Sequence, residues 1–114
     1  MKKLLEELKA IDRACYDEIW QWALWQVGDE GPYAGDEPEY LKHRDDVIQG
    51  ACQRAITRSG WHWLLEDGDP SITCGMFQCD IFDSDYNTIK CYVQGDSPAK
   101  AILTAYITAR KVKP

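Results

Sequence analysis

Long apolar runs are absent from this 114-residue sequence. The longest uncharged apolar stretch falls far short of the roughly 20 residues that a membrane span needs, so we expect no transmembrane helix. The amino terminus begins like a secretory signal, but Glu6, Glu7 and Lys9 interrupt it before an apolar core region can form. We therefore expect a cytosolic protein that does not contact a membrane.

Positive charge is scarce between Gly60 and Asp96, where Lys90 is the only lysine or arginine. Seven acids lie in this segment, so it accounts for the whole net charge of -6. Direct binding to nucleic acid is disfavoured, because phosphates are bound through lysine and arginine. A basic partner is favoured, although a solvated acidic surface that only aids solubility explains the same charge. The acids are Glu66, Asp67, Asp69, Asp80, Asp83, Asp85 and Asp96.

Motifs for a metal, a cofactor or a catalytic centre are also missing. The five cysteines are an odd number with mostly apolar neighbours, which is typical of buried free thiols. Cys74 and Cys79 are five residues apart on a predicted strand, so they point to opposite faces and do not suit a shared zinc. Neither His43 nor His62 has a nucleophile nearby in the sequence. We therefore predict no enzymatic activity, no metal and no cofactor.

Tryptophan, by contrast, is abundant: the chain has five, and Trp20, Trp22 and Trp25 crowd the end of the first predicted helix. At about 100° per residue, Trp22 falls on the buried stripe, whereas Trp20 lies roughly 160° away on a charged face. Leu24 and Val27 lie beside Trp20. An apolar patch on a charged face usually meets a partner, either elsewhere in the chain or in another molecule. We predict Trp20, Leu24 and Val27 as a partner-binding patch, unless a later helix covers them.

The order of hydrophobic patterns and turn signals predicts a single α+β domain over residues 1–114, arranged α-α-β-β-β-α. The first helix is predicted over Lys2–Val27, with one apolar stripe facing the core. The second begins at the capping residue Asp36 and stops at Ser59-Gly60. Ser97-Pro98 combines a helix cap with a first-turn proline, so it opens the final helix.

Three strands are predicted between the second and final helices, over Trp61–Leu65, Ile72–Phe82 and Thr88–Gln94. Trp61 and Trp63 share one strand face and are predicted as core, with His62 on the other face. Tight turns make the sheet antiparallel, and helices cover its apolar face. Alternation predicts three pairs on that face: Phe77 with Val93, Cys79 with Cys91, and Ile81 with Ile89.

The run from Gly95 to Tyr106, which follows a Trp-rich strand and two further strands, resembles the end of the small phage "ABA sandwich" domain proteins. In those proteins, strands lead into a helix that opens Thr/Ser-Pro and continues with an Ala-Ile-x-x-Ala pattern. The resemblance covers less than half of the chain and implies a phage or prophage origin, without catalytic residues to carry over. Small acidic proteins of that origin are often inhibitors of host machinery, including anti-CRISPR proteins. The matching positions are Ser97, Pro98, Ala101, Ile102 and Ala105.

These features favour a non-enzymatic phage-type protein that inhibits a host protein by covering a basic, nucleic-acid-binding surface. The acidic loops would stand in for phosphates, and the Trp20 patch would add an apolar anchor or form a homodimer. The residues predicted to bind the partner through charge are Glu66, Asp67, Asp69, Asp80, Asp83 and Asp85.

Two other functions agree with the same sequence. The first is the binding or sequestration of a small ligand such as a nucleotide signal, in a pocket lined by aromatic residues with arginine or lysine nearby for the phosphate. The second is a structural or assembly subunit. The aromatic residues in question are Trp20, Trp61, Trp63 and Tyr92, and the basic ones are Arg54, Arg58 and Lys90.

Overall fold

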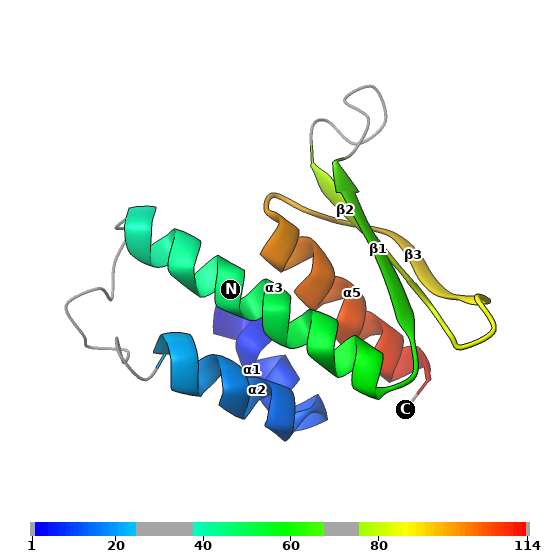
Figure 1. Cartoon of the computed structure of the whole chain (residues 1–114), viewed down its shortest axis with the longest axis horizontal. Coiled ribbons are helices and arrows are strands. Elements are labelled where there is room, and N and C mark those ends of the chain that lie inside the picture. Colours follow the sequence, from blue (N-terminus) through cyan, green and yellow to red (C-terminus); the bar gives the residue numbers. More distant parts are fainter. Residues whose placement is uncertain (1, 25–37, 68–75, 114) are drawn as a thin grey trace.

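The computed structural model describes residues 2–24, 38–67 and 76–113, and it has the predicted α+β order of elements (Figure 1). Two helices and a π-helical turn come first, followed by a long helix, three strands and a last helix. The elements are α1 (Lys2–Ile11), α2 (Arg13–Ile19), η1 (Trp20–Leu24), α3 (Pro38–Arg58), β1 (His62–Asp67), β2 (Phe77–Phe82), β3 (Thr88–Gly95) and α5 (Pro98–Val112). The predicted cap Asp36 and residues 72–75 of the second predicted strand lie outside the described residues.

The last helix, α5, lies at the centre of the molecule, between the sheet and the other helices (Figure 1). Eight residues of α5 are buried, and at about 100° per residue they cover roughly two thirds of its circumference. The reason is that β2 and β3 pack on one side of α5 while α1 and α3 pack on the other. The buried residues are Ala99, Ala101, Ile102, Leu103, Ala105, Tyr106, Ile107 and Ala109.

The beginning of α5 agrees with the prediction from the sequence. Ser97 is the N-cap, and its hydroxyl oxygen accepts a hydrogen bond from the backbone N–H of Lys100 at 3.2 Å. Pro98 occupies the first turn, where a missing N–H costs nothing. None of the described helices is both long enough and apolar enough to cross a membrane.

The single first helix predicted over Lys2–Val27 is wrong, because the chain leaves the helical conformation at Asp12. Asp12 has a φ of -143° and a ψ of 88°, and its carboxylate accepts a hydrogen bond from the N–H of Cys15 at 3.1 Å. Asp12 therefore caps a new helix, α2, instead of continuing α1. Both helices still contribute to the core, α1 through Leu8 and α2 through Ile19.

Within the described residues the sheet has three strands in the order β1-β2-β3, and both pairings are antiparallel, as predicted. Near the turn, Phe82 pairs with Thr88, which agrees with the predicted alternation. Farther from the turn the predicted pairs Phe77–Val93, Cys79–Cys91 and Ile81–Ile89 are wrong, because β3 uses two more residues than β2 over the same stretch. The observed partners are Gly95 for Phe77, Val93 for Cys79 and Lys90 for Ile81.

A β-bulge in β3 explains part of this shift. Tyr92 has a φ of 59°, in the left-handed region, and lies between the paired residues Lys90 and Val93. The N–H of Tyr92 donates to Asp80 Oδ1 at 2.7 Å, so the side chain of Asp80 compensates for the broken ladder. Side-chain alternation alone does not reveal a bulge, because the apolar residues on both sides of it still reach the core.

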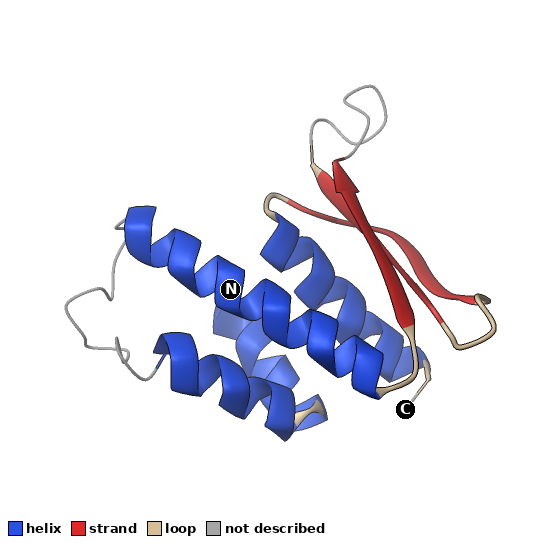
Figure 2. Cartoon of the chain, in the orientation of Figure 1, coloured by secondary structure: helices blue, strands red, loops and turns tan. Residues whose placement is uncertain are grey.

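One face of the sheet packs on the helices and the other face points away from them (Figure 2). Trp61 and Trp63 are partly buried against the core, which confirms the prediction that they belong to it. The indole of Trp61 meets the ring of Tyr106 edge-on, at 6.5 Å between centroids and an interplanar angle of 66°. Also buried or packed on the core are Leu65, Phe77, Cys79, Ile81, Ile89 and Val93.

Candidate binding surfaces

The tryptophans of η1 are exposed. Trp20 is 45% exposed and Trp22 is 57% exposed, so the prediction that Trp22 belongs to the core is wrong. A π-helical turn holds more residues than an α-helical one, so Trp22 points further from the core direction set by Ile19 than the α-helical step predicts. Leu24 ends η1 without a described side chain, and Val27 lies outside the described residues.

The end of η1 is tied to α3 by His43. The imidazole Nε2 of His43 lies 3.0 Å from the carbonyl oxygen of Trp22 and donates a hydrogen bond to it in the Nε2–H tautomer. The contact satisfies one of the backbone carbonyls that a helix end leaves free. This contact holds the backbone at Trp22 in place, while the indoles of Trp20 and Trp22 stay on the surface.

Replacing Trp20 with alanine is expected to lower the free energy of unfolding by about 1 kcal/mol, because nearly half of the side chain is already in water. The control is Ile19→Ala, one residue earlier, where a fully buried side chain is lost. That change is expected to cost about 2–5 kcal/mol. Urea unfolding measures both. Equal losses for the two variants would show that Trp20 is covered in solution.

The predicted acidic residues do not form one patch. Glu66 and Asp67 end β1, whereas Asp83 and Asp85 follow β2. Because His62, at the start of β1, pairs with the last residue of β2, the Asp83–Asp85 turn lies at the opposite end of the sheet from Glu66. Glu66 pairs with Gln78, which precedes Asp83 by five residues along β2, a distance of roughly 17 Å. Asp69 lies outside the described residues.

Two of the acids are engaged in the fold itself. The carboxylate of Asp80 accepts the N–H of Tyr92, and Asp83 Oδ1 accepts the N–H groups of Asp85 at 2.9 Å and Asn87 at 3.0 Å. Lys113 Nζ lies 3.6 Å from Asp83 Oδ2. The bond from the Asn87 N–H, followed by the Asp85 N–H and the Lys113 charge, holds the pKa of Asp83 below its usual value.

The acids that remain available for a partner are therefore fewer than the sequence predicted. Glu66, Asp67 and Asp85 are exposed, and no hydrogen bond from another described residue engages their carboxylates. Asp80 and Asp83 shape the bulge and the turn, and their loss would disturb the sheet before it disturbed any binding.

The outer face of the sheet points away from the helices (Figure 2). It carries exposed apolar side chains. Leu64 is 48% exposed and Tyr92 is 71% exposed. The imidazole of His62 stacks on the ring of Tyr86, with 4.3 Å between centroids and an interplanar angle of 6°. In the described part of the chain, no element covers this face. It is formed by His62, Leu64, Glu66, Asp80, Phe82, Tyr86 and Tyr92.

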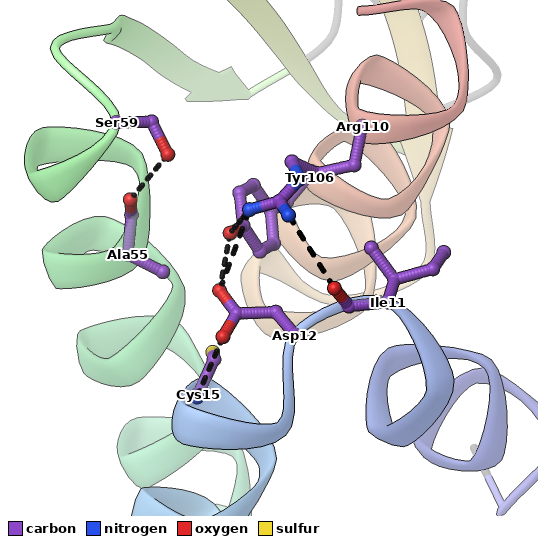
Figure 3. A network of polar contacts seen from close by, with 7 residues as sticks. All are labelled: Ile11, Asp12, Cys15, Ala55, Ser59, Tyr106 and Arg110. Carbon is purple, nitrogen blue, oxygen red and sulfur yellow. Dashed lines mark hydrogen bonds and ion pairs between the residues drawn. The ribbon is translucent and has the colours of Figure 1, made fainter. Parts of the chain in front are cut away.

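A polar network joins α5 to the break between α1 and α2 (Figure 3). The hydroxyl of Tyr106 donates to Asp12 Oδ2 at 2.5 Å, and Arg110 Nη1 donates to the Tyr106 oxygen at 3.0 Å. Arg110 Nη2 also lies 3.4 Å from the carbonyl oxygen of Ile11. The side chain of Asp12 is only 15% exposed, so the network is largely shielded from water. Its groups satisfy one another, which identifies it as a structural feature.

Both titrating groups of this network have shifted pKa values. Burial acts to raise the pKa of Asp12, but the Tyr106 hydroxyl, the Cys15 N–H and the Arg110 charge lower it more, to below the usual 3.8. Burial and the bond to Asp12 raise the pKa of Tyr106 well above its usual value. The sequence prediction missed Asp12. Aspartate is a common N-cap residue, so Asp12 could have indicated a helix start. The apolar stripe continues on both sides of it, however, and therefore favoured one unbroken helix.

Three of the cysteines are buried thiols. Cys15, Cys52 and Cys79 are free and buried, as the sequence predicted, while Cys74 lies outside the described residues. Burial raises the pKa of Cys79 to about 12, and a hydrogen bond with Cys15 together with burial raises the pKa of Cys52. Such thiols are neutral and act as small apolar side chains. Among the described residues, no group of three or more His, Cys, Asp and Glu is placed to hold a metal ion.

The four aromatic residues proposed to share a ligand pocket lie in different parts of the molecule. Trp20 is on η1, Trp61 packs on Tyr106, and Tyr92 is exposed in β3. Trp63 faces α3 instead, beside Arg54 and Arg58. The predicted pocket is therefore not formed, but one of its aromatic residues meets two of the predicted arginines.

Comparison with protein families, with curated proteins and with solved structures finds no match for this chain. The resemblance of the carboxy-terminal residues to phage proteins therefore stays a prediction.

Proposed function

We propose that this protein is a non-enzymatic binding protein that docks on a basic protein surface through the outer face of its sheet. The observation that carries the proposal is the combination on one uncovered face of Leu64, Tyr86 and Tyr92, all exposed, with exposed carboxylates at both ends. An apolar centre with a charged rim is the usual anatomy of a specific protein interface.

The charges argue for a basic partner. Glu66 lies at one end of the face, with Asp67 beside it at the end of β1, and Asp85 lies at the other end; all three are exposed. Acids spaced along the face attract a surface that carries several lysines or arginines, and they repel acidic proteins. The positive side chain on this part of the sheet is Lys90, which the acids outnumber.

Basic protein surfaces commonly hold the phosphates of nucleic acid through lysine and arginine. The partner we propose is therefore a nucleic-acid-binding host protein, and occupation of its basic surface would inhibit it. A phage or prophage inhibitor acting in the host cytosol, as anti-CRISPR proteins do, agrees with this mode of action. The exposed Trp20 and Trp22 at the other end of the molecule would provide a second contact, to the partner or to a second copy.

The test compares two variants with the same change in net charge. Glu66→Lys with Asp85→Lys reverses one exposed acid at each end of the outer face, and Asp83 is left intact because it holds the turn. The control is Glu6→Lys with Asp46→Lys, at exposed sites on α1 and α3. Each protein is used as bait in a bacterial lysate, and the retained proteins are identified by mass spectrometry.

The wild-type protein and the control are expected to retain the same basic proteins. The Glu66/Asp85 variant is expected to bind them at least about 10-fold more weakly, because like charges then face each other. Added nucleic acid is expected to compete. Equal retention by both variants, or retention that nucleic acid does not affect, contradicts the proposal. Leu64→Ser tests the apolar centre in the same assay.

A further inference from the structure

An open hollow of about 430 Å³ lies where the last turns of α3 meet β1, on the other side of the sheet from the outer face. Its volume is within the range of small-molecule sites. Two guanidinium groups and one indole contribute to it, although the protein as a whole is acidic. The lining residues are Gly50, Gln53, Arg54, Thr57, Arg58 and Trp63.

The guanidinium of Arg54 is held in place. Glu18 on α2 accepts hydrogen bonds from Arg54 Nε at 3.1 Å and from Arg54 Nη2 at 2.9 Å. The same guanidinium lies over Gly50, so close that a Cβ at position 50 would be 3.2 Å from its Nη1 and 3.3 Å from its Nη2. The pair with Glu18 does not use Nη1. Arg54 therefore presents a donor group without having to be ordered first.

Arg58 and Trp63 complete the hollow. Arg58 lies one helical turn after Arg54, so the two side chains emerge on the same face of α3. The side chain of Trp63 comes from β1 and is partly buried against the core, which limits its freedom to move. Glu18 neutralises one of the two guanidinium groups, so the hollow retains one net positive charge.

A ligand for this hollow needs a negative group for the arginines and a planar ring for the indole. Guanidinium groups bind phosphate oxygens through paired hydrogen bonds. Any of the nucleobases can stack on a tryptophan ring, because every base has a π-face. The geometry points to a binding site for a nucleoside monophosphate, with its phosphate on Arg54 and Arg58 and its base against Trp63.

This site is independent of the proposed docking on a basic protein. It uses residues of α3 and the inner side of β1, whereas the docking surface uses Leu64 and the acids at the ends of the outer face. Arg58→Ala should leave the retention of basic proteins unchanged, and the Glu66/Asp85 variant should leave nucleotide binding unchanged. A failure of one proposal is thus distinguishable from a failure of the other.

The experiment is a titration of the full-length ¹⁵N-labelled protein by NMR with AMP, GMP, CMP and UMP, and separately with adenosine and inorganic phosphate. At least one mononucleotide is expected to shift the indole Nε1–H resonance of Trp63 and to leave the indole resonance of Trp20 unchanged. The Trp63 resonance is assigned as the one that Trp63→Phe removes. Its affinity is expected to exceed those of adenosine and phosphate by about 10-fold or more, because ring and phosphate contacts then act together.

Arg58→Ala is expected to weaken nucleotide binding by about 10-fold, because it removes a charge-assisted hydrogen bond to the phosphate. Gly50→Val is expected to weaken it as well, because it fills the hollow and displaces Arg54. The matched control is Arg13→Ala on α2, which removes an exposed arginine that is paired with Asp17 of the same helix. Thermal unfolding of each variant confirms that it is folded.

Three results would overturn the proposal. The first is the absence of a Trp63 shift with all four mononucleotides at about 1 mM, the weak end of specific binding. The second is adenosine or phosphate alone binding as tightly as the nucleotide. The third is equal nucleotide affinity in the folded Arg58→Ala and Arg13→Ala variants.

Discussion

Replacing Asp12 with alanine is expected to lower the free energy of unfolding by about 3 kcal/mol. Loss of the helix cap costs about 1 kcal/mol, and a buried O–H left without an acceptor costs about 1–3 kcal/mol. Asp12 provides both contacts, because it caps α2 and accepts the hydrogen bond from the fully buried Tyr106. Chemical denaturation, followed by circular dichroism, measures the change.

The control for this prediction is Asp17→Ala, on the same helix. Asp17 forms an ion pair with Arg13 at 2.8 Å, but both side chains are well exposed, at 58% and 66%. Exposed pairs contribute little, so this change is expected to cost less than about 1 kcal/mol. If Asp12→Ala were as mild as Asp17→Ala, the network in Figure 3 would not stabilise the protein.

The pH dependence of stability provides a second check on Asp12. Its pKa in the folded protein is below 3.8, the usual value, so the folded state binds this proton less readily than the unfolded state does. The stabilisation is therefore fully present above pH 3.8 and is lost as the pH falls through the lower folded pKa. Asp12→Asn should lack this part of the acid sensitivity. Wild type and Asp12→Asn should converge in stability at low pH, and parallel curves would contradict the assignment.

Replacing Gly95 with alanine is expected to cost about 3 kcal/mol, the upper range for forcing extra volume into a packed site. A Cβ at position 95 would lie 2.5 Å from the backbone nitrogen of Ala101 and 2.9 Å from its Cα. These are backbone atoms of α5, so relief requires the end of β3 to move away from the central helix. Thermal and urea unfolding measure the loss.

Gly50→Ala is the matched control for Gly95. A Cβ at position 50 meets only the guanidinium of Arg54, at 3.2 Å, and a shift of a few tenths of an ångström at the far end of this side chain relieves the contact. Because glycine within a helix costs up to about 1 kcal/mol relative to alanine, this variant is expected to be neutral or slightly more stable. A Gly95→Ala variant that behaved like Gly50→Ala would show that the end of β3 is not tightly packed on α5.

The order of elements was predictable because the signals that define it are local. Ser97 and Pro98 start α5 as predicted, and Phe77, Cys79 and Ile81 of β2 face the core. Capping uses atoms within three or four residues, and alternation is a property of each strand alone. The sequence therefore contained the α+β arrangement, the antiparallel sheet and the segregation of acidic charge.

The candidate sites were predictable only as a set of residue types. Asp80 and Asp83 were grouped with Glu66 and Asp85 because all are acids in one segment. The structure shows that the first two hold a bulge and a turn, while the others are exposed at opposite ends of the sheet. Their different roles depend on which backbone groups fold back to meet them, and that is not a property of the segment alone.

Trp22, Asp12 and the hollow at Arg54 show what only the tertiary structure decided. A stripe drawn for one continuous helix placed Trp22 in the core, but the break at Asp12 and the π-helical turn after Ile19 changed its direction. Asp12 begins a new helix where Tyr106, more than ninety residues later, donates a hydrogen bond to its carboxylate and Arg110 lies 3.8 Å from it. The sequence by itself determined the elements and the charge of this protein, because helix periodicity and caps are local. Packing between distant segments decided which tryptophans, acids and arginines are exposed, because exposure depends on what covers a residue.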